Sequence, residues 1–265
     1  MADRPSDQLA ASDLSKLIQK IRARTPARLL AGRSGGSYRT STQLELREAH
    51  AAARDAVLVE LNLEKHFDAA FIRQRNLFEV FTQAASKEQY LLRPDMGRQF
   101  SSASREEILK QCSGNNDLQI VIGDGLSVTA VVSQVSPLLE HLIEGAKGRG
   151  WSVGQSFVIQ HCRVGVLNEI GELLSPRVAV LLIGERPGLA TAESLSAYLA
   201  YRPNKTHSDA DRNLISNIHR RGVDVHQASE RILKLAASMM AAQTSGCQLR
   251  EEMPELDKTG ANELP

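Results

Sequence analysis

Short apolar runs alternate with helical patterns in the second half of the chain. The runs LQIVIG (118–123), SFVIQH (156–161) and RVAVLLIG (177–184) are rich in β-branched residues and typical of buried strands. Helical patterns lie before, between and after these runs, at residues 105–112, 126–150, 169–174, 191–200 and 226–243. Because buried strands separated by helices form parallel sheets with crossover connections, we predict a three-layer α/β domain with a mostly parallel sheet.

The first hundred residues have helical rather than α/β patterns. An Ala-rich helix is predicted for residues 42–57 and a further helical region for 64–85, before the turn at Pro94. An amphipathic helix is predicted nearer the N-terminus, because apolar residues fall at helical spacing: Leu14, Leu17, Ile18 and Ile21. It either packs on the main body or serves as a partner-binding or targeting helix. The expected parts are an N-terminal amphipathic extension (1–25), a helical region (26–100), the α/β domain (101–249) and a flexible tail (250–265).

Three polar segments begin where the predicted strands end. They are GDGLS (123–127), HCRVG (161–165) and GERPG (184–188). Open α/β sheets bind ligands at the carboxyl ends of their strands, so these segments form the candidate site. Asp124 and Glu185 could accept hydrogen bonds from ligand hydroxyls or amides. Plainer interpretations are a routine strand-to-helix turn at Asp124 and a surface pair between Glu185 and Arg186.

A fourth segment, SDADRNLISNI (208–218), surrounds the apolar pair Leu214-Ile215 with polar residues. A merely solvated loop seldom needs such a pair at its centre. We therefore predict a loop packed against a pocket, with Asn213 and Ser216 among its polar side chains.

Charge and composition narrow the class of protein. The net formal charge is +1, from 32 basic and 31 acidic residues, and aromatic residues make up only 4%. This balance excludes a whole-chain basic field for nucleic acid and disfavours base-stacking surfaces. No apolar stretch approaches the ~20 residues that span a bilayer, and the N-terminus has no apolar signal core. The three cysteines lack Cys-x-x-Cys spacing, so we expect reduced thiols in a cytoplasmic protein.

Several cofactor and catalytic motifs are absent from the sequence. There is no Gly-x-Gly-x-x-Gly after a strand and no Gly-x-Ser-x-Gly elbow. Residues 224–229 nearly match the Asp-x-His-x-x-Gly loop by which some cobalamin proteins supply histidine as the lower ligand, but the final glycine is missing. We interpret Asp224 as a helix cap and expect no ligation by His226. The glycine-rich loop at 32–36 is either a plain connection or an anion site.

Taken together, these segments resemble one family, the small (light, beta) subunit of ethanolamine ammonia-lyase, an adenosylcobalamin-dependent enzyme. The resemblance rests on GRSGGSYRTSTQLELREAHAAARDAV, YLLRPDMGR, IVIGDGLS, RVGVLNEIGELL, VAVLLIGERPGLATAESLSAYLAY and DADRNLISNI. These stretches keep the family's order and cover roughly residues 26–249. LLIGERPGL…SLSAYL together with DRNLISNI is the most specific pair.

The resemblance implies a Rossmann-like domain preceded by helices. It also implies that cobalamin lies at the interface with a large subunit and that the cobalamin keeps its own dimethylbenzimidazole as the lower ligand. By matching position, Val164, Glu185 and Leu214 are the expected cofactor contacts, although Leu214 stands where many relatives have cysteine. Secondary candidates for cofactor contact in the same segments are Asp124, Arg163, Arg186, Asn213 and Ser216. No catalytic residue and no metal ligand is expected in this chain.

The implied reaction converts ethanolamine, and related vicinal amino alcohols, to an oxo compound and ammonia. The partner is the large (heavy, alpha) subunit, in an expected assembly of six large and six small subunits, with no nucleic acid or membrane partner. The segment ahead of the match is shorter than in some relatives, where it directs packaging into a bacterial microcompartment, so packaging is left open. Two alternatives are a non-catalytic assembly or packaging protein and a stand-alone Rossmann-type enzyme with a nucleotide cofactor.

Overall fold

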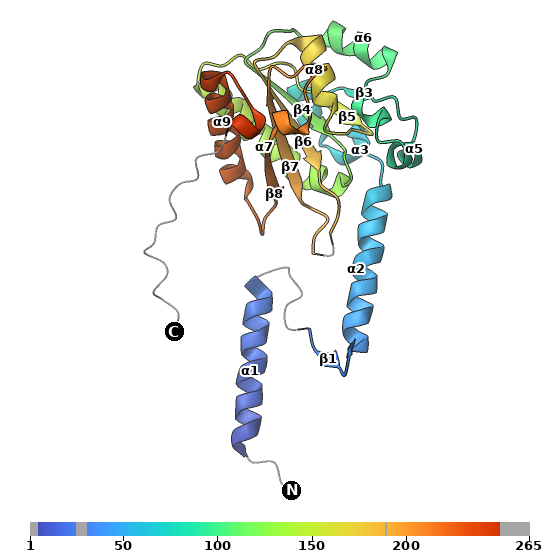
Figure 1. The fold of residues 1–265 in the computed structure, drawn as a ribbon, viewed down its shortest axis with the longest axis vertical. Coiled ribbons are helices and arrows are strands. Elements are labelled where there is room, and N and C mark those ends of the chain that lie inside the picture. Colours follow the sequence, from blue (N-terminus) through green and yellow to red (C-terminus); the bar gives the residue numbers. More distant parts are fainter. Residues whose placement is uncertain (1–4, 25–30, 189, 250–265) are drawn as a thin grey trace.

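A computed structural model of the protein describes residues 5–24, 31–188 and 190–249, and within them a mixed six-stranded sheet forms the centre of the fold (Figure 1). In spatial order the strands are β3 (Glu79–Phe81), β5 (Val158–Gln160), β4 (Leu118–Gly123), β6 (Val178–Gly184), β7 (Leu195–Tyr201) and β8 (Asn213–Ile218). The first four are parallel to one another, β7 is antiparallel to β6, and β8 is antiparallel to β7. The predicted α/β class with a mostly parallel sheet is confirmed.

Helices cover both faces of the sheet. Two of them, α7 (Val128–Gly148) and α9 (Val225–Ala242), pack on one face, and α6 (Ser102–Gln111) and α8 (Val166–Leu174) pack on the other (Figure 1). Neighbouring residues of β4 point to opposite faces, so Ile120 and Ile122 join the core under α7 and α9 while Val121 joins the other core. Full burial of each such side chain contributes about 1.5–3 kcal/mol. The two cores establish the predicted three layers.

The prediction of a helix at residues 191–200 is wrong, because most of this stretch belongs to strand β7. Leu195 pairs with Gly184 and Tyr201 with Val178, so β7 runs antiparallel along the whole of β6. Its serine, alanine and leucine residues suit a helix as well as a strand, so composition alone misleads here. The short connection between Gly184 and Leu195 leaves no room for a helical crossover, and the chain folds back beside β6 instead.

The stretch 208–218 is also more regular than the predicted loop. A short 3₁₀ turn, η2 (Asp209–Asp211), leads into the edge strand β8. Ile215 and Ile218 are buried whereas Leu214 is 46% exposed, so this edge strand turns two apolar side chains into the core and leaves Leu214 on its open side. The predicted position against a pocket is correct, but a strand rather than a loop supplies it.

Residues 26–100 contribute a strand as well as helices. After α3 (Leu63–His66) and α4 (Ala69–Arg75), β3 pairs in parallel with β5 and extends the sheet by one strand. The helix α5 (Lys87–Leu92) and the turn η1 (Met96–Arg98) then lead to α6. The helical-region prediction missed β3 because so short a strand carries too little periodicity to be detected.

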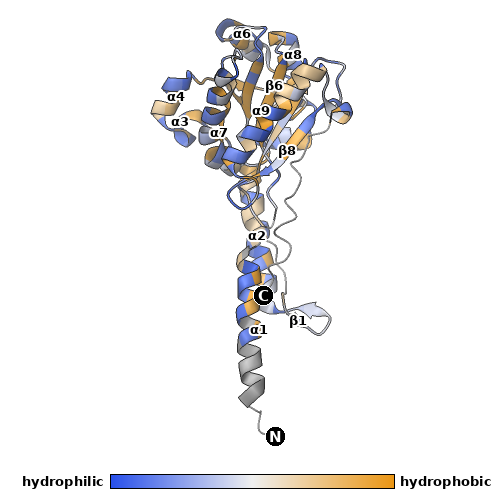
Figure 2. Ribbon diagram, turned by 90° about the vertical axis from the view of Figure 1, so that its left-hand side faces the viewer, coloured by the Kyte–Doolittle hydropathy of each residue, from blue (hydrophilic) through white to orange (hydrophobic). Residues whose placement is uncertain are grey.

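The N-terminal helix does not pack on the α/β domain. Figures 1 and 2 show α1 (Pro5–Arg24) and most of α2 (Thr40–Leu58) projecting away from the sheet, and the coloured parts of both helices in Figure 2 mix apolar and polar residues. Leu14 and Leu17 of α1 are 58% and 53% exposed. The glycine-rich loop forms the turn of a small hairpin between β1 (Arg33–Ser34) and β2 (Ser37–Tyr38). This exposure does not fit a helix packed on the main body, and binding to a partner or targeting stays a prediction. The tail 250–265 lies outside the described residues.

Asp224 caps helix α9, as predicted from the sequence. One of its carboxylate oxygens accepts hydrogen bonds from the backbone N–H groups of His226 and Gln227, at 2.9 and 3.0 Å. These bonds satisfy free amides of the first turn. The His226 ring faces His141 of α7, with 5.7 Å between the ring centroids, and is therefore part of a helix–helix contact.

The three thiols differ sharply in accessibility. Cys112 and Cys162 are buried and Cys247 is exposed, all three as free thiols. Burial raises the pKa of Cys112 to about 11 and that of Cys162 well above its ordinary value, so both stay protonated at pH 8. We expect Ellman's reagent at pH 8 to titrate Cys247 rapidly in the folded chain and the other two thiols only after denaturant is added. Rapid reaction of all three in the folded chain would contradict this packing.

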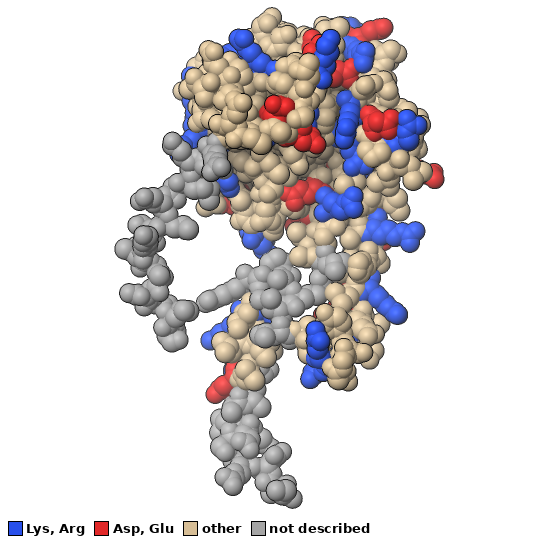
Figure 3. Space-filling view, viewed as in Figure 1, with Lys and Arg blue, Asp and Glu red and all other residues tan. Residues whose placement is uncertain are grey.

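Charges of both signs are mixed on the surface of the domain. On the face shown in Figure 3, lysine and arginine side chains alternate with aspartate and glutamate rather than forming one continuous basic area. Among the described helices, none is both long and apolar enough to cross a membrane.

Candidate functional site

A cavity of about 430 Å³ lies at the carboxyl edge of the parallel strands. Its walls come from the β4–α7 and β5–α8 connections, from the end of β6 and from the neighbouring strands β7 and β8. Six of the eight residues singled out from the sequence line it: Arg163, Val164, Glu185, Arg186, Leu214 and Ser216. Segments far apart in sequence thus meet at one edge, as the strand-end rule predicts.

Glu185 is the best-anchored charge in this cavity. One carboxylate oxygen accepts from the Ser194 hydroxyl at 2.7 Å. The other accepts from the Ser196 hydroxyl at 2.7 Å and from the backbone N–H of Asn217 at 2.8 Å. These contacts join the end of β6 to β7 and β8, and they replace the simple Glu185–Arg186 surface pair considered from the sequence. A carboxylate has about four acceptor positions, so one remains for a ligand N–H.

Apolar side chains form the walls beside this carboxylate. Leu214 on β8 lies opposite Tyr198 of β7, and Leu214 keeps 46% of its surface exposed. Val164 is partly buried in the β5–α8 connection and packs beside the core under α6 and α8. Exposed apolar walls with a few fixed polar groups are typical of sites for organic ligands and cofactors.

Arg163 is held over an aromatic ring rather than extended into solvent. Its guanidinium carbon lies 4.1 Å from the centre of the Tyr90 ring, and one of its terminal nitrogens donates to the Tyr90 carbonyl at 3.2 Å. Its Nε is buried and has no partner among the described residues. Gly97 makes this position possible, because a Cβ there would lie 2.6 Å from the Arg163 side chain. The turn in YLLRPDMGR therefore supports the site from below.

The structure places Asp124 and Asn213 outside the cavity. Asp124 is 1% exposed, and its carboxylate bonds to Lys87 and to the backbone N–H of Cys162. The side chain of Asn213 bonds to the backbone of Gly246 and Leu249 and so anchors the C-terminal segment. Both residues support neighbouring chain segments instead of facing a ligand. Sequence position alone could not show in which direction either side chain points.

Three residues of the cavity were missed from the sequence: Tyr90, Ser196 and Tyr198. The two on β7 were missed because residues 191–200 were taken as a helix, although Leu195, Ala197 and Leu199 alternate with Ser196 and Tyr198 as in a strand. Burial raises the pKa of Tyr90 far above its ordinary value, with a further contribution from Asp124, so its hydroxyl stays protonated. That hydroxyl donates to the Cys162 carbonyl at 3.1 Å.

A second, more polar cavity of about 580 Å³ is lined by residues from α8 and from the segment before β8, and it has no lining residue in common with the first. Its charged side chains are largely paired with one another: Arg105 with Glu169, and Arg212 with Asp209. Because these pairs satisfy most of the charge, the cavity beside Glu185 remains the stronger candidate site.

Within the ranges that the structure describes, no group of three or more His, Cys, Asp or Glu residues is arranged to hold a metal ion.

Comparison with known proteins places the chain in a family. A family model described as the ethanolamine ammonia-lyase light chain (EutC) matches residues 15–250. The ethanolamine ammonia-lyase small subunit of Clostridium perfringens is 39% identical over 250 residues, covering 94% of this chain and 80% of the relative. The small subunits of Clostridium acetobutylicum and Pseudomonas paraeruginosa are 38% and 40% identical, each over 88% of this chain and over 94% and 86% of their own lengths. The chain belongs to the ethanolamine ammonia-lyase small-subunit family, a family of lyase subunits.

Proposed function

We propose that this chain holds adenosylcobalamin at the interface with the large subunit of an ethanolamine ammonia-lyase. The observation that carries the proposal is the meeting of Val164, Glu185 and Leu214 in one cavity at the carboxyl edge of the sheet. Family membership supports the same assignment, because these are the positions at which the family resemblance implies contact with the cofactor. The reaction is the conversion of ethanolamine, and of related vicinal amino alcohols, to an oxo compound and ammonia.

The cavity suits part of a corrinoid. The rim of a corrin ring is apolar but bears amide side chains, which match the apolar walls at Val164 and Leu214 and the anchored acceptor Glu185. A volume of about 430 Å³ holds less than a complete corrinoid with its nucleotide. The rest of the cofactor would therefore extend beyond this chain and be covered by a second protein surface, which supports a site between subunits.

The residues of this chain bind and orient the cofactor but do no acid–base chemistry. Glu185 accepts hydrogen bonds from amide groups, Val164 and Leu214 cover apolar edges, and Arg163, Arg186 and Ser216 supply donors around the rim. When bound, adenosylcobalamin supplies the carbon-centred radical that takes a hydrogen atom from the substrate. Val164 and Leu214 also keep water from the covered face.

The lower ligand of the cofactor remains its own dimethylbenzimidazole in this proposal. The one sequence segment similar to a histidine-ligation loop, at Asp224 and His226, is a helix cap, and its histidine contacts α7 rather than the cavity.

We propose that six large and six small subunits assemble in the cytoplasm. Packaging into a microcompartment has one observation in its favour, the exposed apolar residues Leu14 and Leu17 on the projecting helix α1.

Ammonia release tests the proposal directly. The large subunit would be supplied with ethanolamine and adenosylcobalamin, with and without this chain. We expect ammonia only when both subunits are present, because the cofactor is not held in place otherwise. Equal activity of the large subunit alone would make this chain a non-catalytic assembly or packaging protein. Turnover by this chain alone would indicate a stand-alone enzyme.

A further inference from the structure

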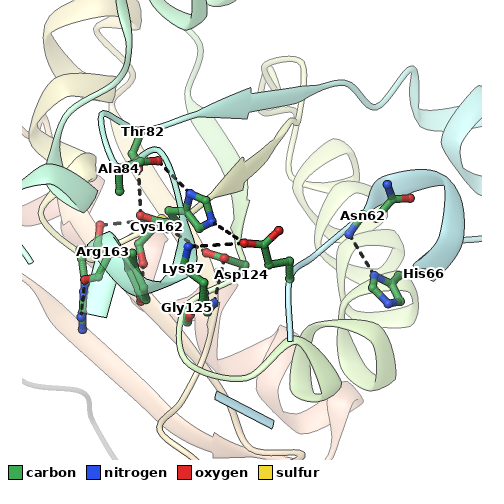
Figure 4. Close-up of polar contacts among 12 residues, drawn as sticks. Asn62, His66, Thr82, Ala84, Lys87, Asp124, Gly125, Cys162 and Arg163 are labelled. Atoms are coloured by element: carbon green, nitrogen blue, oxygen red, sulfur yellow. Dashed lines mark hydrogen bonds and ion pairs between the residues drawn. The ribbon is translucent and has the colours of Figure 1, made fainter. Parts of the chain in front are cut away.

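A buried ion pair lies beneath the candidate cofactor cavity. Lys87 of α5 and Asp124, at the end of β4, are 3.1 Å apart, and their side chains are only 6% and 1% exposed. Figure 4 shows the two side chains pointing toward each other beside Gly125 and Cys162. Because burying two charges is costly, such a pair is weak evidence for stability and invites another explanation.

The pair is hydrogen-bonded to the backbone of both connections that line the cavity. Lys87 Nζ also donates to the Gly125 carbonyl at 3.0 Å, which fixes the β4–α7 connection. Asp124 Oδ1 accepts from the Cys162 N–H at 2.8 Å, which fixes the β5–α8 connection. The adjoining residues Gly125, Leu126, Arg163 and Val164 line the cavity, whereas neither Lys87 nor Asp124 does.

The β5–α8 connection needs such support because its backbone is strained. His161 has φ of +56°, in the left-handed region that non-glycine residues rarely adopt. Its carbonyl accepts from the Thr82 hydroxyl at 3.0 Å, and its ring bonds to the Ala84 carbonyl at 2.9 Å. The next residue, Cys162, is held at its N–H by Asp124 and at its carbonyl by Tyr90. Strain that persists under so many contacts is typical of functional sites.

We propose that Lys87 and Asp124 are positioning residues, which hold both connections in the conformation that receives the corrinoid. This inference rests on the proposed cobalamin function. The pair acts through its hydrogen bonds to Gly125 and Cys162 and touches no ligand itself. Its removal should therefore impair binding more than folding.

Two double variants separate hydrogen bonding from charge. Lys87→Met with Asp124→Leu removes both. Lys87→Gln with Asp124→Asn removes only the charges, because the two introduced amide side chains can still bond to the Gly125 carbonyl and to the Cys162 N–H. The matched control is Arg177→Met with Asp117→Leu. That ion pair joins the amino ends of β4 and β6, at the edge of the sheet opposite the cavity.

The experiment measures cyanocobalamin binding by absorbance titration of the full chain co-expressed with the large subunit. Hydrogen exchange of residues 161–164 is measured on the same complexes without cobalamin. We expect the Met/Leu variant to bind about tenfold more weakly or worse, and its amides to exchange faster, because supporting residues typically carry effects of this size. The Gln/Asn variant and the control should match the wild type.

Unchanged affinity and exchange in the Met/Leu variant would overturn the inference. An equal loss in the Gln/Asn variant would also overturn it, because the pair would then act through charge. If the wild-type complex itself fails to bind cyanocobalamin, the proposed function fails, and the inference falls with it. If the Met/Leu variant does not fold, Lys87→Met alone deletes the ion pair and the bond to the Gly125 carbonyl without changing a residue that lines the cavity, and wild-type exchange and affinity in that variant would contradict the proposal.

Discussion

Replacing Glu185 with alanine is expected to lower the affinity of the assembled complex for cobalamin by about 30-fold, since a hydrogen bond to a charged group contributes about 2 kcal/mol. The substitution removes the anchored acceptor in the cavity and the three bonds that hold β7 and β8 to the end of β6. Absorbance titration with cyanocobalamin measures the affinity, and urea unfolding measures stability on the same preparation.

Folding should suffer less than binding in this variant. The donors that Glu185 leaves behind are two serine hydroxyls, which can rotate, and the N–H of Asn217, an exposed residue whose amide can bond to water. We expect the free energy of unfolding to fall by only about 1 kcal/mol. The matched control is Glu193→Ala, which removes an exposed carboxylate from the same connection. Cobalamin affinity equal to wild type in Glu185→Ala would remove Glu185 from the proposed site.

The chain also illustrates which parts of an α/β site can be predicted from sequence. The strands β4 and β6 are fully buried along their length, so their apolar runs have one plausible interpretation. The strand-end rule then located Arg163, Val164 and Glu185 correctly at one edge. These predictions depend only on local composition and on the general geometry of parallel sheets.

The failures share a different physical cause. β7 was mistaken for a helix because its small residues pack equally well in either structure, and the antiparallel pairing with β6 that decides the matter is a tertiary contact. The partner of Asp124 is Lys87, 37 residues earlier, and no sequence pattern connects them. Side-chain direction at a strand end and long-range ion pairs are properties of the packed fold.

Gly184→Ala is expected to lower the free energy of unfolding by about 3 kcal/mol, the upper end of typical overpacking costs. A Cβ at this position would lie 2.0 Å from the Ser127 carbonyl oxygen and 2.9 Å from that of Asp124, and both are backbone atoms. The turn cannot easily retreat, because the Leu126 N–H donates to the Gly184 carbonyl at 3.0 Å and Gly125 already has φ of +58°. Urea unfolding followed by circular dichroism measures the loss.

Gly148→Ala is the control for the same substitution at an open position. Apart from the adjoining residues and the backbone of α7 itself, no heavy atom lies within 4 Å of a Cβ there, at the end of α7, so alanine should be neutral or stabilise by up to about 1 kcal/mol. Gly184 directly precedes Glu185, and any shift that relieves its clash moves this carboxylate or the β4–α7 connection. Cobalamin affinity should therefore fall together with stability in Gly184→Ala. A variant as stable as Gly148→Ala, with affinity intact, would mean that the turn relaxes freely and that close backbone packing does not fix the cavity.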